Sequence, residues 1–343
     1  MQAALPTVSV CLITYNHATF IKAAIESALA QVADFGIEIV IGEDCSIDGT
    51  REICEELARV HPDIIRLNLQ PNNMGADFNV RSTLRLCRGK YIALLEGDDY
   101  WLDSQKLAKQ VSALEMDSKL SACCHAVDVL VDKTSEIIDA RAAGYLSRSD
   151  SSPFNWSAKD WPRATPATGS LLIRTEVLKL LASQLHHAPL YDAMVLFGAH
   201  REGDIPYIPT VMGVYRIHSG GMWSGASKEM HYRVTLRTVF ELIRHQFFRD
   251  DSVHSWLKML FEYNAIKLAG LSSSDEDFQV MTGLKWDEIS DNCSLNPWGL
   301  RTACQDIIAA NQAASALRRS LSFRLGNGIV SKLRKCVSVF EPK

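Results

Sequence analysis

The sequence predicts an α/β fold, with an open, mainly parallel sheet flanked by helices and a helical C-terminal region. Two observations lead to this prediction. Over residues 7–117, short apolar runs rich in β-branched residues alternate with segments whose apolar residues have helical spacing. From about residue 226 onward the pattern is mostly helical. Alternating strands and helices are typical of parallel sheets covered on both faces. We therefore expect two domains, at residues 1–225 and 226–343.

Four apolar runs are expected to form the first strands, because each is short and bounded by turn residues. They are TVSVCLITY (7–15), IEIVIG (37–42), DIIRLNLQ (63–70) and YIALLE (91–96). Helical spacing then predicts helices within residues 17–32, within 46–60 with Asp48 or Thr50 as the cap, within 78–89 closed by Gly89, and within 103–117 capped by Asp103 or Ser104.

The middle of the chain is less regular. SACCHAVDVLV (121–131) reads as a strand, and residues 147–168, rich in Ser, Pro and Trp, read as one long loop. Residues 169–185 predict a short strand and then a helix, 190–203 a helix, and 204–218 an extended segment.

The composition excludes several classes of protein. The chain is 47% apolar and 22% charged with a formal net charge of −4, so we expect no nucleic-acid partner. No stretch approaches the roughly 18–20 apolar residues that span a bilayer, and the N-terminus has no signal-peptide pattern. The nine cysteines include no CxxC pair, which argues against a zinc site or redox motif and favours a cytoplasmic location.

Polar turns follow three of the predicted strands, and ligands of parallel α/β folds bind at the carboxyl ends of strands. The fourth strand runs into Asp98 and Asp99, whose carboxylates repel one another. Hard oxygen ligands of this kind suit Mg²⁺ or Mn²⁺, which would offset the repulsion and hold a diphosphate. The alternative is a solvated acidic turn that caps the next helix.

Two further turns are candidates for nucleotide contacts. In GEDCSIDGT (42–50), Asp44 ends the second strand, where its carboxylate could accept a hydrogen bond from a base N–H. An ordinary Asx turn explains it equally well, and Asp48 is better explained as a helix cap. In NNMG (72–75), Asn73 and Gly75 follow the third strand, and turn chemistry alone accounts for them.

The three strand ends match, in order, the motifs of a known family. The chain resembles the family 2 glycosyltransferases, which have the GT-A fold, in TYN (14–16), EDCSIDGT (43–50), NNMG (72–75) and EGDD (96–99). The resemblance is strong over residues 7–115 and good again over 166–225. There it rests on ATPATGSLLIR (164–174), LYDAMVLFGAHREGDIPYI (190–208) and YRIHSGGMWS (215–224).

The resemblance implies an inverting, metal-assisted transfer of a sugar from a nucleoside diphosphate sugar, with a UDP-sugar expected. The acceptor would be a hydroxyl of a glycan or lipid-linked glycan, in bacterial surface polysaccharide synthesis. Asp192 falls at the position of the general base, and Glu96 stands where the family has an aspartate that contacts ribose. The implied donor-binding residues are Thr14, Tyr15, Asn16, Asp44, Asn73, Gly75, Glu96 and Asp98, and the implied ligands of Mn²⁺ or Mg²⁺ are Asp98, Asp99 and His218. His218 can otherwise be a histidine that ligates nothing, and Asp192 can also cap its helix.

Other functions remain open at this point. A sugar nucleotidyltransferase would normally carry a Gly-rich, basic loop after the first strand, and TYNHATF (14–20) lacks one. A receiver-like phospho-acceptor domain would need an acidic pair after the first strand, and a non-catalytic nucleotide-sugar binder is a further alternative. Residues 313–343 are basic and apolar by turns, which suits a peripheral contact with the inner face of the membrane, or equally a helical-bundle face or an oligomer contact.

Overall fold

The computed structural model describes residues 5–143, 145–147, 152–157, 165–185, 190, 192–244, 251–272, 274–282, 284 and 304–315. The described residues group into two compact units. The first extends to Ala226 and includes a short segment that ends at Val253, and the second takes in the other described residues from Ser227 onward.

The first unit is built on a mixed sheet, and ten strands of the described chain belong to it. Four parallel strands form one side in the order β3 (Ile65–Leu69), β2 (Ile37–Glu43), β1 (Val8–Thr14) and β4 (Tyr91–Glu96). The three-residue strand β9 (Leu172–Arg174) then pairs antiparallel with both β4 and β6 (Ala122–Val131). Beyond them, β10 (Ile205–Ile217) runs parallel to β6, and β5 (Tyr100–Trp101) lies antiparallel to β10.

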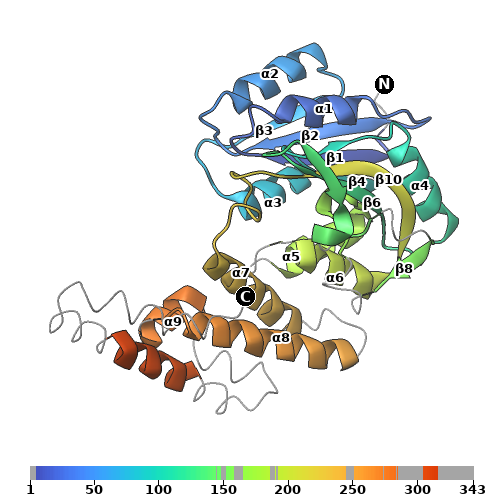
Figure 1. The fold of residues 1–343 in the computed structure, drawn as a ribbon. Helices are drawn as coiled ribbons and strands as arrows, with labels where there is room; N and C mark the ends of the chain where they lie inside the picture. The colour runs from blue at the N-terminus through green and yellow to red at the C-terminus, as the bar shows by residue number, and fades with distance from the viewer. Residues whose placement is uncertain are drawn as a thin grey trace. The chain divides into compact units, whose positions relative to one another are not determined.

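Helices cover both faces of this sheet, as predicted (Figure 1). On one face, α1 (Ile21–Leu29), α2 (Thr50–Val60) and α4 (Lys106–Met116) contribute apolar side chains to one core cluster. Alternate strand residues, such as Val8, Val10 and Leu12, face the same cluster. Because strand side chains alternate between faces, the apolar runs of the sequence supply cores on both sides.

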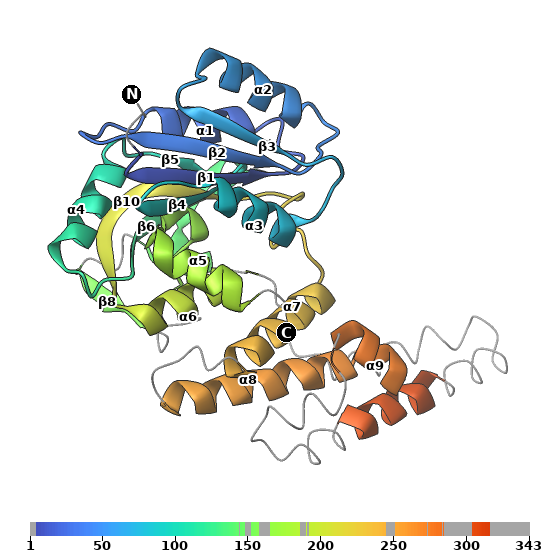
Figure 2. The same ribbon diagram turned by 180° about the vertical axis from the view of Figure 1, so that it is seen from behind.

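On the opposite face, α3 (Ala76–Leu86) packs closely on β2 and lies beside α5 (Thr175–Gln184) (Figure 2). A Cβ on Gly42 of β2 would lie 2.1 Å from Thr83 Oγ1, so only glycine fits there. The Arg81 guanidinium on α3 donates hydrogen bonds of 2.8 Å to the carbonyl oxygens of Ala182 and Leu185. Polar contacts therefore fix α3 against both the sheet and α5.

Several helix ends differ from the sequence-based prediction. The N-cap of α2 is Gly49, not Asp48 or Thr50, and that of α4 is Gln105, not Asp103 or Ser104. The first helix begins at Ile21 rather than residue 17, because residues 15–20 form a turn after β1. The third helix ends at Leu86 with Cys87 as its C-cap, so Gly89 does not close it. A Cβ on Gly89 would lie 2.5 Å from the Ser9 nitrogen, and this close approach to β1 explains the glycine.

The segment expected to be one long loop, 147–168, contains a strand. β8 (Phe154–Trp156) pairs antiparallel with β10, and the Trp156 side chain is fully buried. Elsewhere in the first unit, β7 (Glu136–Asp139) pairs with β6, and α6 (Asp192–Glu202) precedes β10. Trp156 of β8 therefore belongs to the protein core.

The second unit is helical, as expected from the pattern. It contains α7 (Lys228–Arg244), all but the first three residues of α8 (Asp251–Ala269), α9 (Asp275–Thr282) and a further helix at 304–315. None of the helices that the structure describes is both long enough and apolar enough to cross a membrane. The proposed membrane contact falls on residues 313–343, and from residue 316 onward this segment lies outside the described residues.

Candidate active site

The carboxyl ends of β1, β2 and β4 lie together at one edge of the parallel strands. In the strand register, Thr14 is paired with Glu43, and Ile13 with Glu96. The polar turns that follow these strands must therefore meet, although they are far apart in the sequence. The fold thus brings the residues predicted from three separate motifs to one place.

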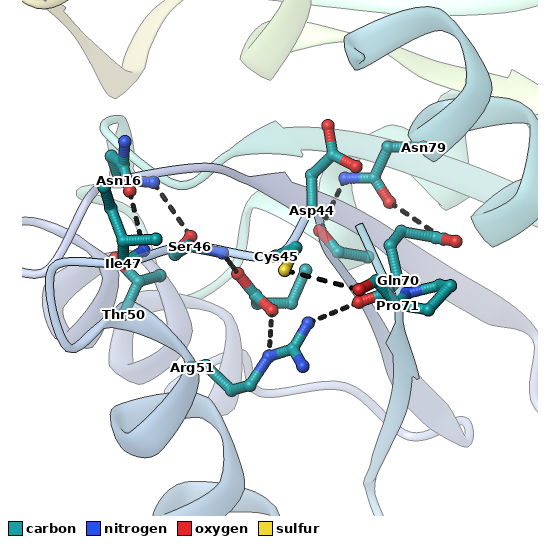
Figure 3. A network of polar contacts seen from close by, with 12 residues as sticks. Asn16, Asp44, Cys45, Ser46, Ile47, Thr50, Arg51, Gln70, Pro71 and Asn79 are labelled. Atoms are coloured by element: carbon teal, nitrogen blue, oxygen red, sulfur yellow. Dashed lines mark hydrogen bonds and ion pairs between the residues drawn. The ribbon is translucent and has the colours of Figure 1, made fainter. Parts of the chain in front are cut away.

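The turn after β1 is held against the turn after β2 by hydrogen bonds (Figure 3). The Asn16 backbone N–H donates to Ser46 Oγ at 2.9 Å, and Asn16 Oδ1 accepts from the Ile47 N–H at 3.0 Å. Asn16 adopts φ +54°, a left-handed conformation that asparagine tolerates better than most residues. Thr14 is buried and Tyr15 is exposed. Asn16 therefore shapes the turn that presents its neighbours.

Asp48 and Thr50 fix the next residues of the same turn. Asp48 Oδ2 accepts from the Ala18 N–H at 3.0 Å, and Thr50 Oγ1 accepts from the His17 N–H at 2.8 Å. Asp48 Oδ1 also accepts from the Thr50 hydroxyl at 2.6 Å and from its N–H at 3.1 Å. Burial alone would raise the pKa of Asp48, but these hydrogen bonds lower it. The N-cap of α2 is Gly49 rather than Asp48 or Thr50, but Asp48 binds the Thr50 N–H at the start of α2 and anchors the first turn.

The Asp44 carboxylate fastens the turn after β3. Its Oδ1 accepts from the Met74 N–H at 2.8 Å and its Oδ2 from the Gly75 N–H at 2.9 Å. Asn73 Oδ1 accepts from the same Gly75 N–H at 3.0 Å, and Gly75 has φ +86°. Both Asp44 oxygens therefore have backbone partners, although a carboxylate keeps further acceptor sites.

An ion pair between the buried Glu43 and the partly exposed Arg51, which the sequence interpretation did not select, supports the loop after β2 (Figure 3). Glu43 accepts from Arg51 Nε through Oε2 and from the Ser46 N–H, at 2.6 Å, through Oε1. The Arg51 guanidinium also donates to the Gln70 carbonyl at 2.6 Å. Cys45, with φ +61°, lies within the strained loop that these bonds enclose. The network fixes the path of the chain from β2 to α2.

The side chains of His17, Asp98 and His218, which follow three different strands, lie close together. His218 Nε2 lies 3.0 Å from Asp98 Oδ2, and His17 Nε2 lies 3.9 Å from the same oxygen. One nitrogen or oxygen of each residue lies within 4.8 Å of the others, and all three residues are partly buried. Burial lowers the pKa of His17, while the Asp98 charge opposes this shift. The cluster can hold a metal ion, and it includes a histidine that the motif analysis passed over although it directly follows TYN.

Asp99 is not part of the cluster formed by His17, Asp98 and His218. It is 4% exposed, and its Oδ1 accepts from the Arg216 N–H at 2.8 Å. The Arg216 guanidinium also donates to the Asp98 carbonyl at 2.9 Å. Burial raises the pKa of Asp99 well above its ordinary value, and the Asp98 and Glu96 charges add to the rise. Asp99 is thus absent from the His17, Asp98 and His218 cluster and joins β10 to the end of β4.

Glu96 and Asp192 interact electrostatically. Burial raises the pKa of Glu96 to about 8, and the charges of Asp98 and Asp192 contribute to this rise. Asp192 begins α6, where its Oδ1 accepts from the Ala193 N–H at 2.7 Å. The residue is exposed, yet the protein around its carboxyl raises its pKa by desolvation. Asp192 therefore begins α6, and its charge acts on Glu96 at the end of β4.

A tyrosine pair that the sequence did not single out adjoins these acids. The rings of Tyr145 and Tyr215 lie 4.8 Å apart, and their hydroxyls are hydrogen-bonded to one another. Burial raises the pKa of Tyr145, and the charge of Asp192 raises it further. Tyr215 begins the motif YRIHSGGMWS (215–224), but Tyr145 lies in none of the motifs, so only the fold could reveal this pair.

The motifs, the sheet and the strand-end site now agree with a comparison to known families. Residues 9–181 match the model of glycosyl transferase family 2. The chain belongs to glycosyl transferase family 2, which confirms the family named from the motifs.

Individual relatives cover parts of the chain. An uncharacterized protein of Mycobacterium tuberculosis is 31% identical over 228 residues, which make up 64% of this chain and 61% of that protein. The Escherichia coli UDP-Glc:α-D-GlcNAc-diphosphoundecaprenol β-1,3-glucosyltransferase WfaP is 34% identical over 110 residues, or 32% of this chain and 42% of that protein. The chain thus spans less than two thirds of each of these two relatives.

A solved structure supports the predicted GT-A fold. A mannosyltransferase from Pyrobaculum calidifontis, in complex with GDP-Man and Mn²⁺, has a TM-score of 0.55 at 16% identity and covers 92% of this chain and 81% of its own. At this identity the likeness concerns the fold.

Proposed function

We propose that the protein is an inverting glycosyltransferase that moves a sugar from a nucleoside diphosphate sugar to a hydroxyl group. One observation supports this most strongly. The charges of Asp98 and Asp192, from motifs nearly a hundred residues apart, both raise the pKa of Glu96. Carboxyl groups brought together in this way, with a histidine on one of them, suit a site for a diphosphate, a cation and a proton acceptor.

The donor would lie across the ends of β1, β2 and β4. Thr14, Tyr15 and Asn16 would line the nucleoside from one turn, and Asp44 with Asn73 and Gly75 from another. Glu96 would contact the ribose. Its raised pKa, about 8, leaves it largely protonated at neutral pH, so it can donate a hydrogen bond to a hydroxyl as well as accept one.

Asp98 and His218 would hold the divalent cation near the diphosphate. Their side chains fit such an ion, because carboxylate oxygen and imidazole nitrogen are both common ligands of Mn²⁺ and related metals. The cation, when bound, supplies positive charge against the charge that develops on the departing diphosphate. Arg216 keeps the Asp98 backbone in place through its hydrogen bond to the carbonyl.

Asp192 would act as the general base. The acceptor oxygen attacks the anomeric carbon as the bond from that carbon to the diphosphate oxygen breaks, and Asp192 takes the hydroxyl proton. Attack from the face opposite the leaving group inverts the anomeric centre. The raised pKa of Asp192 makes it a better proton acceptor than an ordinary aspartate once it is ionised. No covalent intermediate is needed.

We further propose a UDP-sugar as donor and a glycan or lipid-linked glycan as acceptor, in surface polysaccharide synthesis at the cytoplasmic side of the membrane. The name of the Escherichia coli relative, which states a UDP-Glc donor and a diphosphoundecaprenol-linked acceptor, supports both choices.

A donor screen tests the proposal. Purified full-length protein is incubated with UDP-, GDP- and dTDP-sugars, with and without Mn²⁺, and thermal stabilisation is read alongside donor turnover. We expect one nucleotide class to stabilise the protein, donor cleavage that depends on the cation, and loss of cleavage on adding a chelator. Stabilisation without any turnover, across a panel of acceptors, would instead indicate a nucleotide-sugar binding protein.

A further inference from the structure

We propose that His17 is a third protein ligand of the cation site, and that the resulting His17, Asp98 and His218 set selects Mn²⁺, Co²⁺ or Zn²⁺ over Mg²⁺. This inference rests on the cation role of the proposed function and adds a ligand and an ion preference to it. The three donor atoms come from the turn after β1, the end of β4 and the end of β10.

The separation of His17 from Asp98 fits a shared ion better than a direct contact. His17 Nε2 lies 3.9 Å from Asp98 Oδ2, which is too long for a hydrogen bond. Two ligands that each lie about 2.1 Å from one ion can be separated by up to about 4.2 Å. Both the 3.9 Å separation and the 3.0 Å separation from His218 Nε2 to Asp98 Oδ2 fall within that limit.

The orientation of His17 is fixed by its surroundings. Its Nδ1 lies 3.3 Å from Thr14 Oγ1, which leaves Nε2 for Asp98, and its backbone N–H donates to Thr50 Oγ1 at 2.8 Å. A hydrogen bond at one ring nitrogen commonly directs the other nitrogen of a metal-binding histidine. Gly97 allows this arrangement, since a Cβ there would lie 2.9 Å from His17 Nδ1.

The second imidazole is fixed as well. The His218 ring lies 4.8 Å from the Phe20 ring and 6.0 Å from the His17 ring, measured between centroids. The Arg216 guanidinium covers Phe20 at 4.6 Å. Both histidines are therefore held before any ion arrives, which lowers the ordering cost of binding.

The ligand atoms of the site determine which metal ion it prefers. A pair of carboxylates, Asp98 with Asp99, would suit Mg²⁺, which prefers oxygen ligands and retains much of its water. In the structure Asp99 instead accepts a hydrogen bond from the Arg216 backbone. Two imidazoles and one carboxylate favour borderline transition metals, with affinity rising from Mn²⁺ through Co²⁺.

The test measures metal binding without donor or turnover. Mn²⁺ binding to metal-free, full-length protein is followed by electron paramagnetic resonance, with Mg²⁺ as competitor. We expect His17→Gln to weaken Mn²⁺ binding at least about tenfold, since even losing a hydrogen-bond partner of a metal ligand commonly costs that much, and to reduce the preference for Mn²⁺ over Mg²⁺. His61→Gln, at the C-terminal end of α2, is the control and should bind Mn²⁺ like the unmodified protein.

A second variant distinguishes the loss of a metal ligand from the loss of the folded structure. His17→Glu replaces nitrogen by oxygen, so we expect it to bind Mg²⁺ relatively better than the unmodified protein does, a gain that misfolding cannot produce. The inference is overturned if His17→Gln binds Mn²⁺ normally, or if it weakens only UDP binding measured in chelator, which would place His17 on the diphosphate. Normal Mn²⁺ binding by the unmodified protein without any sugar transfer would contradict the proposed function and leave the ligand assignment standing.

Discussion

His218 Nε2 lies 3.0 Å from Asp98 Oδ2, although the two residues are 120 positions apart in the chain. The contact joins the end of β10 to the turn after β4. Arg216, two residues before His218, binds the same turn through the Asp99 carboxylate and the Asp98 carbonyl. The crowded acids at residues 96–99 are thus matched by donors from one distant strand.

Asp192→Asn should lower the transfer rate by about 10²–10⁴-fold, the usual contribution of a general base. Asparagine keeps the side-chain oxygen that accepts from the Ala193 N–H, so the helix start and UDP binding should be preserved. Glu202→Gln, at the other end of α6, is the matched control and should transfer sugar normally. Near-normal turnover by Asp192→Asn would remove Asp192 from the base role.

The pH dependence of sugar transfer by the unmodified protein should also test whether Asp192 is the base. The base works only when ionised, and burial raises the pKa of Asp192 above its ordinary value of 3.8. Transfer should therefore fall as the pH decreases through a pKa above that value. If kcat/KM stays constant down to about pH 4, where an ordinary aspartate titrates, the raised pKa plays no part in transfer.

Asp44→Asn should loosen the turn after β3. The amide group can accept one of the two backbone hydrogen bonds from Met74 and Gly75, but its NH₂ opposes the other N–H. We expect a loss of about 1–3 kcal/mol in unfolding free energy, as for other buried polar mismatches, and weaker UDP binding by calorimetry. The exposed Asp34→Asn is the control. Weaker UDP binding at unchanged stability would instead show that Asp44 contacts only the nucleotide.

Gly97→Ala should disturb the cation site without removing any of its proposed ligands. The added Cβ would lie 2.5 Å from Thr14 Oγ1 and 2.9 Å from His17 Nδ1, so the first turn must move. We expect weaker Mn²⁺ binding and a stability loss of about 1–3 kcal/mol from overpacking. Gly36→Ala is the control, since the nearest atom there, Pro6 Cα, is 3.4 Å away. Equal Mn²⁺ affinity in both variants would mean that the turn adapts freely.

Glu38→Gln should destabilise the parallel side of the sheet. Glu38 on β2 is 3% exposed and accepts from Ser9 Oγ at 2.6 Å and from Arg88 Nη2 at 2.7 Å. Burial alone would raise the pKa of Glu38, but the hydrogen bonds from Arg88 and Ser9 lower it below 4.5. We expect a loss of about 1–3 kcal/mol at neutral pH, typical of hydrogen bonds to a charged group.

The pH dependence of that loss has a definite sign. Because the folded-state pKa is depressed, the stabilisation by Glu38 is complete above the unfolded pKa and disappears as the pH falls through the folded value. Urea unfolding of Glu38→Gln and the unmodified protein should therefore converge at acid pH. Glu26→Gln removes an exposed pair with Lys22 and should change little at any pH. A difference that persists at low pH would point to packing rather than charge.

The parallel half of the fold followed from local pattern. Strands such as Tyr91–Glu96 are short apolar runs between polar turns, and their common direction brings the predicted site residues to one edge. Family membership followed from motifs that lie on those edges. Both depend on information within a few residues, which a single sequence contains.

The partners of individual site residues could not be predicted in the same way. Asp99 and Asp98 are adjacent, and only the position of β10 decides that one meets the Arg216 backbone and the other His218. The strand Phe154–Trp156 depends likewise on its pairing with β10. Such contacts arise from packing between segments that are distant in the sequence, and a short sequence pattern does not specify that packing.

The place of β10 in the chain has a consequence for protein synthesis. Asp98 leaves the ribosome 120 residues before His218, an interval of about 6–24 s at 5–20 residues per second. Throughout that interval the growing chain has its acidic turn but neither Arg216 nor His218. A chain interrupted before β10 therefore keeps the acids of residues 96–99 without the groups that pair with Asp98 and Asp99 in the folded protein.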